Sequence, residues 1–237
     1  MSHSDYDFRL DCPSSYGCIG PPLSGKSHHV RNLLRLRNEI FKKPIGRVFV
    51  FFKSLQPIYE HYEMICGDAI TFVPGRCTYA WIEKNVPPAD SEEAREGAAT
   101  MIIADDATED VGPDMLNIVN IAVHHRHLVF IVLMHALFSS NRYLSQVNQS
   151  MQYVSVFKFV RNRRQVHTFG GQIDVAEGKF SRYGNRFARI YNEATKWGYG
   201  YLTIDFTQTT PDQYRMRSNI LFENNRPMVI YRFDDSA

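Results

Sequence analysis

GPPLSGKS, residues 20–27, is the stretch that decides the fold. It has the spacing G-x-x-x-x-G-K-[ST], with Gly20, Gly25, Lys26 and Ser27 at the defining positions. In a loop of this kind the backbone N–H groups surround phosphate oxygens, the lysine reaches the β- and γ-phosphates, and the hydroxyl ligates Mg²⁺. A Gly/Pro turn that happens to end in Lys-Ser is the alternative, so the neighbouring sequence has to decide.

The segments on either side of the loop have the patterns of a strand and a helix. Residues 7–12 (DFRLDC) alternate as a half-buried strand does, and residues 15–20 lead directly into the loop. After the loop, Val30, Leu33, Leu34 and Phe41 recur near helical spacing. A strand, a glycine loop and a helix in this order bring loop amides and a helix N-terminus to one anion. The candidate nucleotide-binding residues are Gly20, Pro21, Pro22, Leu23, Ser24, Gly25, Lys26, Ser27 and His28.

A second element of the site is an apolar run that ends in two carboxylates, TMIIADDA at residues 100–107. Asp105 is the expected Mg²⁺ ligand together with Ser27, and Asp106 could accept a proton from the attacking water or orient it. The run at 128–134 ends at His135, whose imidazole N–H could donate to a γ-phosphate. The alternative for the two aspartates and for His135 is a purely structural role, in which the side chain caps the end of a strand at the following turn.

Alternating strand and helix patterns predict an α/β fold with a mainly parallel central sheet and helices on both faces. Two strands, 47–53 and 69–73, lie between the glycine loop and the acidic strand, which favours a P-loop NTPase of the additional-strand (RecA-like or ASCE) type. We expect a single P-loop ATPase domain over residues 1–237, with a β-rich C-terminal extension at about 199–237. Other expected strands are 128–134, 153–159, 199–206, 217–222 and 228–233, and expected helices are 56–65, 78–84, 113–127, 142–150, 162–174 and 181–196.

Composition agrees with one α/β domain and excludes few classes of function. The chain has 237 residues, 44% of them apolar, and a formal net charge of +2. Eight basic residues against two acidic ones between positions 158 and 189 form a candidate anion-facing surface, or else a solvated charged face. Four cysteines without C-x₂-C spacing predict reduced thiols. The longest apolar stretch, 128–134, is far below the ~20 residues that span a bilayer, so no membrane partner is expected.

Two other site types receive little support from the sequence. The histidines of HHRH, residues 124–127, place His124 and His127 one turn apart, but a third metal ligand is not evident. The base-reading motif of GTPases, N-K-x-D, is absent, because Lys84 and Asn85 stand in the reverse order. A Mg-ATP site is therefore favoured over a zinc-type or guanine-specific site.

The ordered set of motifs resembles the viral genome-packaging ATPases of the FtsK/HerA superfamily, in particular the poxvirus-type packaging ATPases of Polintons, adintoviruses and related double-stranded DNA viruses. The resemblance runs from about residue 10 to 222. It is carried by GPPLSGKS, MIIADDA, the segment from HHRH to VRNRRQ (residues 124–165) and YGYLTIDFTQTTPDQYRMRSNIL (residues 199–221). The family commonly has Gln or Asn where His135 stands, and many members have Glu where Asp106 stands.

The resemblance implies an ATP-driven translocase of double-stranded DNA that packages a viral genome. The enzyme would act as a homo-oligomeric ring at a capsid vertex, inside the host cell (nucleus or cytoplasm) at the assembling virion. ATP and Mg²⁺ would be required, and Lys26, Asp106, His135 and Arg161 would act in catalysis. Arg161 would be the arginine finger offered to a neighbouring subunit; Arg142, Arg163 and Arg164 are rival candidates. A small-molecule kinase and a nucleotide-binding module without turnover remain the alternatives.

Overall fold

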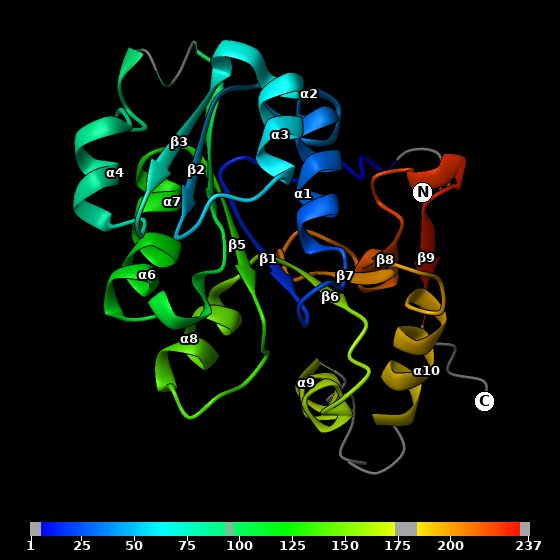
Figure 1. Ribbon diagram of the computed structural model, residues 1–237. Helices are drawn as coiled ribbons and strands as arrows, with labels where there is room; N and C mark the ends of the chain where they lie inside the picture. Colours follow the sequence, from blue (N-terminus) through cyan, green and yellow to red (C-terminus); the bar gives the residue numbers. More distant parts are fainter. Residues whose placement is uncertain (1–5, 93, 95–96, 174–183, 233–237) are drawn as a thin grey trace.

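A single nine-stranded sheet organises the part of the chain that the computed structural model describes, residues 6–92, 94, 97–173 and 184–232 (Figure 1). The strand order is β3-β2-β4-β5-β1-β6-β7-β8-β9. The first six strands in this order are parallel: β3 (Ile70–Pro74), β2 (Ile45–Phe52), β4 (Ala99–Ala104), β5 (Leu128–Met134), β1 (Ser14–Ile19) and β6 (Tyr153–Phe157). The last three are antiparallel: β7 (Tyr201–Asp205), β8 (Met216–Ser218) and β9 (Val229–Tyr231).

The predicted α/β class with a mainly parallel sheet is confirmed. Strand β5 lies between β1 and β4, and this is the additional strand that distinguishes the RecA-like arrangement. Since the three strands are parallel, their carboxyl ends meet at one edge of the sheet. Three parts of the predicted site therefore lie at that same edge: the glycine loop after β1, the acidic pair Asp105 and Asp106 after β4, and His135 after β5.

Helices cover both faces because side chains alternate along buried strands. Ile102 and Phe130 belong to the apolar cluster on one face, whereas Met101, Ile103 and Ile131 belong to the cluster on the other. The second cluster is covered by α1 (Lys26–Arg35), α2 (Arg37–Ile40) and α3 (Ile58–Cys66), which stand together in Figure 1. Helices against the first cluster are α4 (Tyr79–Asn85), α6 (Pro113–Asn117), the π-helix η4 (Ile118–Ala122), α7 (Val123–His125), α8 (Arg142–Ser150), α9 (Arg163–Ile173) and α10 (Gly184–Ala194).

The predicted strand at residues 7–12 is wrong. The first strand is Ser14–Ile19, and in the earlier segment Leu10 makes one isolated bridge to Phe41. Leu10 is 1% exposed, while Phe8 packs edge-on against Tyr214. An alternating apolar pattern can thus arise when two side chains pack on separate elements, without the ladder of hydrogen bonds that defines a strand.

The predicted strand 128–134 and the predicted helix 142–150 occur with the predicted ends, whereas other predicted elements have shifted ends. The strand predicted at 217–222 is the three-residue β8, and the helix predicted at 113–127 is broken into α6, η4 and α7. Several predicted positions lie outside the described residues: residue 174 of the helix 162–174, residues 181–183 of the last helix, residue 233 of the last strand, and Lys179 and Arg182 of the basic stretch. The four cysteines are unpaired. Within the described ranges no helix combines the length and the apolar character needed to cross a membrane.

Candidate nucleotide site

The glycine loop connects the buried end of β1 to the start of α1. Gly20 donates its N–H to the carbonyl of Met134 (3.0 Å), which ties the loop to the end of β5. A Cβ on Gly20 would stand 2.6 Å from Cβ of Phe157, so only glycine fits between β1 and β6 here. Gly25 has φ of 106°, a left-handed conformation that favours glycine, and α1 begins at the next residue.

The N-terminus of α1 carries the positive end of the helix dipole, and the first turn of the helix contains no acidic residue that would neutralise it. No side chain caps it. The first N–H groups of a helix have no partner within the helix. A ten-residue helix that begins in a glycine loop is therefore suited to an anion.

Lys26 lies at the centre of this arrangement and is 7% exposed. Its Nζ donates to the carbonyls of Gly20 (2.6 Å) and Pro21 (2.9 Å) and approaches Nδ1 of His135 (3.2 Å). Burial lowers the pKa of Lys26 to about 8, against the opposing influence of nearby acidic groups. An additional negative charge beside Nζ would raise the pKa of Lys26 and so favour the charged ammonium.

Asp105 follows β4 directly and is also 7% exposed. Its Oδ2 accepts hydrogen bonds from the Tyr59 hydroxyl (2.7 Å) and from Nε2 of Gln56 (3.2 Å). Burial raises the pKa of the Asp105 carboxyl above its ordinary value, and the hydrogen bond from Tyr59 opposes this shift. The carboxylate is thus held in a fixed orientation in a place where its negative charge is poorly solvated.

His135 connects Lys26 to Asp106. Its backbone N–H donates to Oγ1 of Thr108 (2.8 Å), and its Nε2 lies 2.8 Å from Oδ1 of Asp106. Because the Lys26 ammonium can only donate, Nδ1 is the acceptor and Nε2 carries the proton given to Asp106. In this arrangement both ring nitrogens are engaged by protein groups, whereas the sequence predicts an N–H directed to a γ-phosphate.

One cavity of about 370 Å³ collects these groups. Its lining includes Lys26, Ser27, Asp105, Asp106 and His135. Hydroxyl and carboxylate oxygens are the ligand types that Mg²⁺ prefers, so Ser27 and Asp105 fit a magnesium ion. Among the described residues no cluster of three His, Cys, Asp or Glu side chains could hold another metal, and this includes the HHRH segment.

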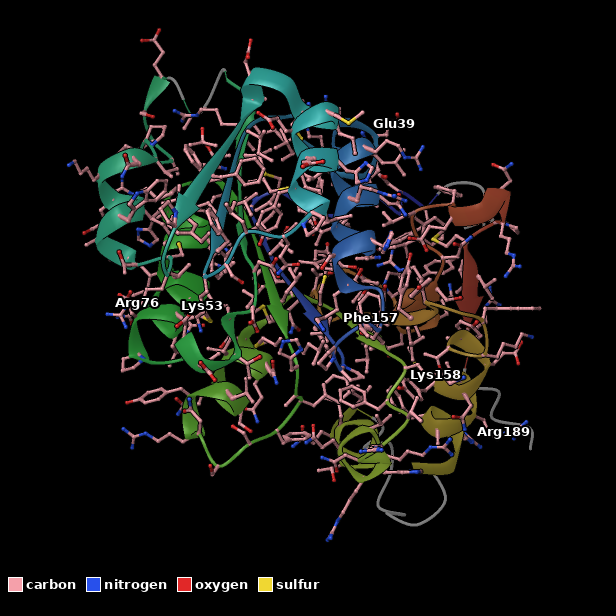
Figure 2. The ribbon with its side chains drawn as sticks, viewed as in Figure 1. Glu39, Lys53, Arg76, Phe157, Lys158 and Arg189 are labelled. Carbon is pink, nitrogen blue, oxygen red and sulfur yellow. The ribbon has the colours of Figure 1, made fainter. Side chains whose placement is uncertain are left out.

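Arg161 does not belong to this cavity. It is exposed in the connection between β6 and α9, and none of the lining residues is an arginine. The rival candidates Arg142, Arg163 and Arg164 are exposed as well. In Figure 2 the basic side chains Lys158 and Arg189 lie near α9 and α10, far from Lys53 and Arg76 on the other side of the molecule.

Gln56, Tyr59 and Tyr199 are among the residues of the site that sequence reasoning missed. Gln56 and Tyr59 hold Asp105, and the position of their segment just after β2, at the same sheet edge, was the available signal. Tyr199 also lines the cavity and covers Gly25, where a Cβ would meet its ring at 2.9 Å. No local pattern relates Tyr199 to the glycine loop, because more than 170 positions separate them.

Comparison with known proteins finds similarity to solved structures alone. No protein-family model and no curated protein matches the chain. The genome packaging NTPase B204 of Sulfolobus turreted icosahedral virus 2, in complex with ATPγS, is 14% identical with a TM-score of 0.49, over 87% of this chain and 96% of that one.

EssC (ATPases 2 and 3) of Geobacillus thermodenitrificans is 12% identical with a TM-score of 0.46; the match covers 66% of this chain and 34% of EssC. The flagellar accessory protein FlaH of Methanocaldococcus jannaschii is 14% identical with a TM-score of 0.40, over 62% of this chain and 74% of that one. This chain thus spans about a third of the EssC structure.

Proposed function

We propose that the protein is a magnesium-dependent ATP hydrolase. The observation that carries the proposal is that the glycine loop and the acidic pair, which belong to separate buried strands, line one cavity. Within the proposal residues 1–237 form one P-loop ATPase domain, with β7 to β9 as its extension. The same loop alone would suit a kinase, but a second carboxylate after the metal ligand favours hydrolysis by water.

The loop amides and the N-terminus of α1 would hold the phosphates, with Lys26 donating to the β- and γ-phosphate oxygens. Magnesium, held by Ser27 and Asp105, would supply positive charge to the transferring phosphoryl group. Gln56 and Tyr59 keep the Asp105 carboxylate in place. These groups account for binding and for charge stabilisation.

Asp106 would orient the attacking water and accept its proton. Its side chain is half exposed, and His135 holds it through one hydrogen bond. An ordinary carboxylate is a weak base at neutral pH, so positioning has to contribute more than basicity. His135 is thus proposed to act on Asp106 and on Lys26, and through them on the terminal phosphate.

The finer proposal is a ring-shaped translocase that packages double-stranded viral DNA at a capsid vertex. The sequence resemblance motivates it, and the exposed basic residues before and within α9 are compatible with it. Arg161 would act on the ATP of a neighbouring subunit, which would make hydrolysis dependent on assembly. Contacts with DNA would be electrostatic and insensitive to sequence.

The test is ATP hydrolysis by the purified protein with and without double-stranded DNA. Wild-type protein should release phosphate in the presence of Mg²⁺, Lys26→Ala should lose the activity, and Lys84→Ala, at an exposed position on α4, should retain it. Stimulation by DNA supports the translocase. Undiminished hydrolysis by Lys26→Ala contradicts the ATPase proposal.

Two further outcomes would select the alternatives. Transfer of phosphate to a metabolite, with no response to DNA, would select a small-molecule kinase. Binding of ATP without phosphate release, even by assembled protein with DNA, would select a module that binds nucleotide without turnover. Thermal melts of each variant exclude unfolding as the cause of a loss.

A further inference from the structure

A second cavity, of about 420 Å³, adjoins the one around the glycine loop. The two share Gly25, His28 and Tyr199 in their linings, so they adjoin each other at the first turn of α1. The second cavity extends from there between α1, the turn after α10 and the C-terminal strands β8 and β9. Its volume is in the range of small-molecule sites.

The second cavity is lined by residues other than the side chains proposed to act in hydrolysis. Asp105, Asp106 and His135, which would act at the terminal phosphate, line the first cavity and not the second. A nucleotide with its γ-phosphate beside these groups has to direct its other end away from them. The first turn of α1, at His28, leads to the second cavity.

Flat side chains stand at the boundary and wall of this cavity. The rings of His28 and Tyr199 stack with their centroids 5.7 Å apart. The Arg226 guanidinium lies 4.4 Å from the centre of the Trp197 ring. Trp197 is 55% exposed. Aromatic rings and guanidinium planes are the groups on which nucleobases stack in proteins.

Polar groups supply hydrogen-bonding positions beside these planes. Nδ2 of Asn32 donates to Oε1 of Glu223 (2.8 Å). This hydrogen bond uses one polar atom of each side chain. His29 is 1% exposed, and its Nδ1 has no hydrogen-bond partner among the described residues. Burial lowers the pKa of His29 to about 3, so the ring is neutral. All three side chains line the cavity.

The charge of the lining suits an uncharged ligand group better than a polyphosphate. Arg31, Lys196 and Arg226 are nearly balanced by Glu193 and Glu223. The phosphates have their own site at the glycine loop, with the helix N-terminus and Lys26. The second cavity therefore fits the part of a nucleotide that carries no charge.

We propose that the second cavity binds the base and ribose of the nucleotide whose phosphates occupy the glycine loop. The base is a purine stacked at the Trp197–Arg226 pair, and Asn32 and Glu223 hydrogen-bond its edge. This inference rests on the proposed function for the position of the phosphates. It adds residues of the C-terminal segment, 193–231, to the substrate site.

The experiment compares ATP with inorganic tripolyphosphate, which has the phosphates and lacks the nucleoside. Calorimetric titration with Mg²⁺ measures both affinities for wild type, Trp197→Ala and Asn32→Ala. We expect each variant to bind ATP about tenfold more weakly and tripolyphosphate as wild type does, because Trp197→Ala removes the stacking of the base and Asn32→Ala removes a hydrogen bond to its edge. Phe222→Ala removes a ring that is exposed to a similar degree, 58%, outside this cavity, and should change neither affinity.

Lys26→Ala separates the two proposals. If it loses both ligands while Trp197→Ala and Asn32→Ala bind ATP normally, the nucleoside site is wrong and the phosphate site stands. If Lys26→Ala binds tripolyphosphate as wild type does, the proposed function itself fails. A loss of both ligands in Trp197→Ala would also overturn the assignment of Trp197 to the base.

A second measurement does not depend on weakening the site. Trp81→Phe leaves Trp197 as the single tryptophan of the chain. Its fluorescence should change on addition of Mg-ATP and stay constant on addition of Mg-tripolyphosphate. The same response to both ligands, or to neither while calorimetry shows that ATP binds, would contradict stacking at Trp197.

Discussion

His135 donates from Nε2 to Oδ1 of Asp106 across 2.8 Å. The same ring receives Lys26 at Nδ1, so one imidazole links the ammonium of the glycine loop to the carboxylate after β4. Asp106 has φ of 50°, a left-handed conformation, and this hydrogen bond restrains its side chain. The chain of contacts makes the positions of the two charged groups depend on each other.

Removal of the His135 ring should reduce turnover more than binding. We expect His135→Ala to lower the hydrolysis rate by about 10²-fold, because Asp106 loses its positioning, with less than a threefold change in affinity for ATP. His135→Gln should recover part of the rate, since its amide can both accept from Lys26 and donate to Asp106. Single-turnover hydrolysis and nucleotide titration measure the two effects. His125→Ala, at an exposed position on α7, is the control.

Affinity for ATP should fall as pH rises above about 8. The pKa of Lys26 in the free protein is lowered to about 8 by burial. Bound phosphates would raise this pKa, so above pH 8 binding has to take up a proton. The dissociation constant should therefore increase about tenfold per pH unit above 8 and change little just below it.

Titrations from pH 7 to 10 test this dependence. Lys84→Ala should follow the wild-type profile, whereas Lys26→Met should bind weakly with a flat one. A flat profile for the wild-type protein would show that Lys26 does not titrate on binding.

Asp105→Asn should stabilise the free protein at neutral pH while it abolishes hydrolysis. Burial raises the folded-state pKa of Asp105, so its folded form takes up protons more readily than the unfolded chain does. This residue therefore reduces the free energy of unfolding as pH rises from about 4 through its raised pKa. Asn keeps the acceptor for Tyr59 and Gln56 without the charge, and we expect a gain of about 1 kcal/mol at pH 7.

Thermal melts at pH 4 and pH 7 check this sign. The gain should shrink as pH falls from 7 to 4, because the raised pKa of the Asp105 carboxyl lets the folded protein take up this proton more readily than the unfolded chain does. Asp106→Asn, at a half-exposed position, serves as the comparison and should change the melting temperature little. A gain that is equal at both pH values would contradict a buried-charge origin.

Arg161→Ala should bind nucleotide normally and lose hydrolysis by about 10³-fold or more if the finger acts between subunits. Mixing it with Lys26→Ala protein should restore part of the rate, because a mixed interface can combine one intact Lys26 with one intact Arg161. Phosphate release by the mixture is the measurement. Failure to complement would argue against Arg161, and the same mixing with Arg142, Arg163 and Arg164 variants would test its rivals.

Gly20→Ala should destabilise the fold by about 1–3 kcal/mol. The added Cβ would stand 2.6 Å from Cβ of Phe157, and β1 and β6 are paired strands that cannot separate cheaply. Gly171→Ala in α9 is the matched control, because a Cβ there meets nothing within 4 Å. We expect this control to be neutral or stabilising, as helix propensity favours alanine. Chemical denaturation measures both changes.

The fold class could be predicted because its signals are local. Continuous apolar runs mark strands that are buried on both faces, and β2, β4 and β5 occur where such runs stand. The segment 7–12 shows the limit of this reasoning. Alternation of Phe8 and Leu10 indicates that both side chains pack against the protein, but it does not indicate which elements they contact.

The candidate site was predictable to the extent that its residues follow strand ends. Lys26, Asp105 and His135 satisfy that rule and line one cavity, and Gln56 could have been found by it. The hydrogen bonds from Lys26 to His135 and from His135 to Asp106 were not predictable, because they depend on rotamers and on distances of tenths of an ångström. The roles of these residues stay predictions for the experiments above.

The sequence alone determined what acts over a few neighbouring residues: a glycine loop with the backbone freedom it needs, an uncapped helix after it, and apolar runs long enough for buried strands. Tertiary structure decided which of these runs became neighbours. Placement of β5 between β1 and β4 brought His135 between Lys26 and Asp106, and the antiparallel return of β7 carried Tyr199 to Gly25. Strand order results from packing across the whole sheet, and no local pattern encodes it.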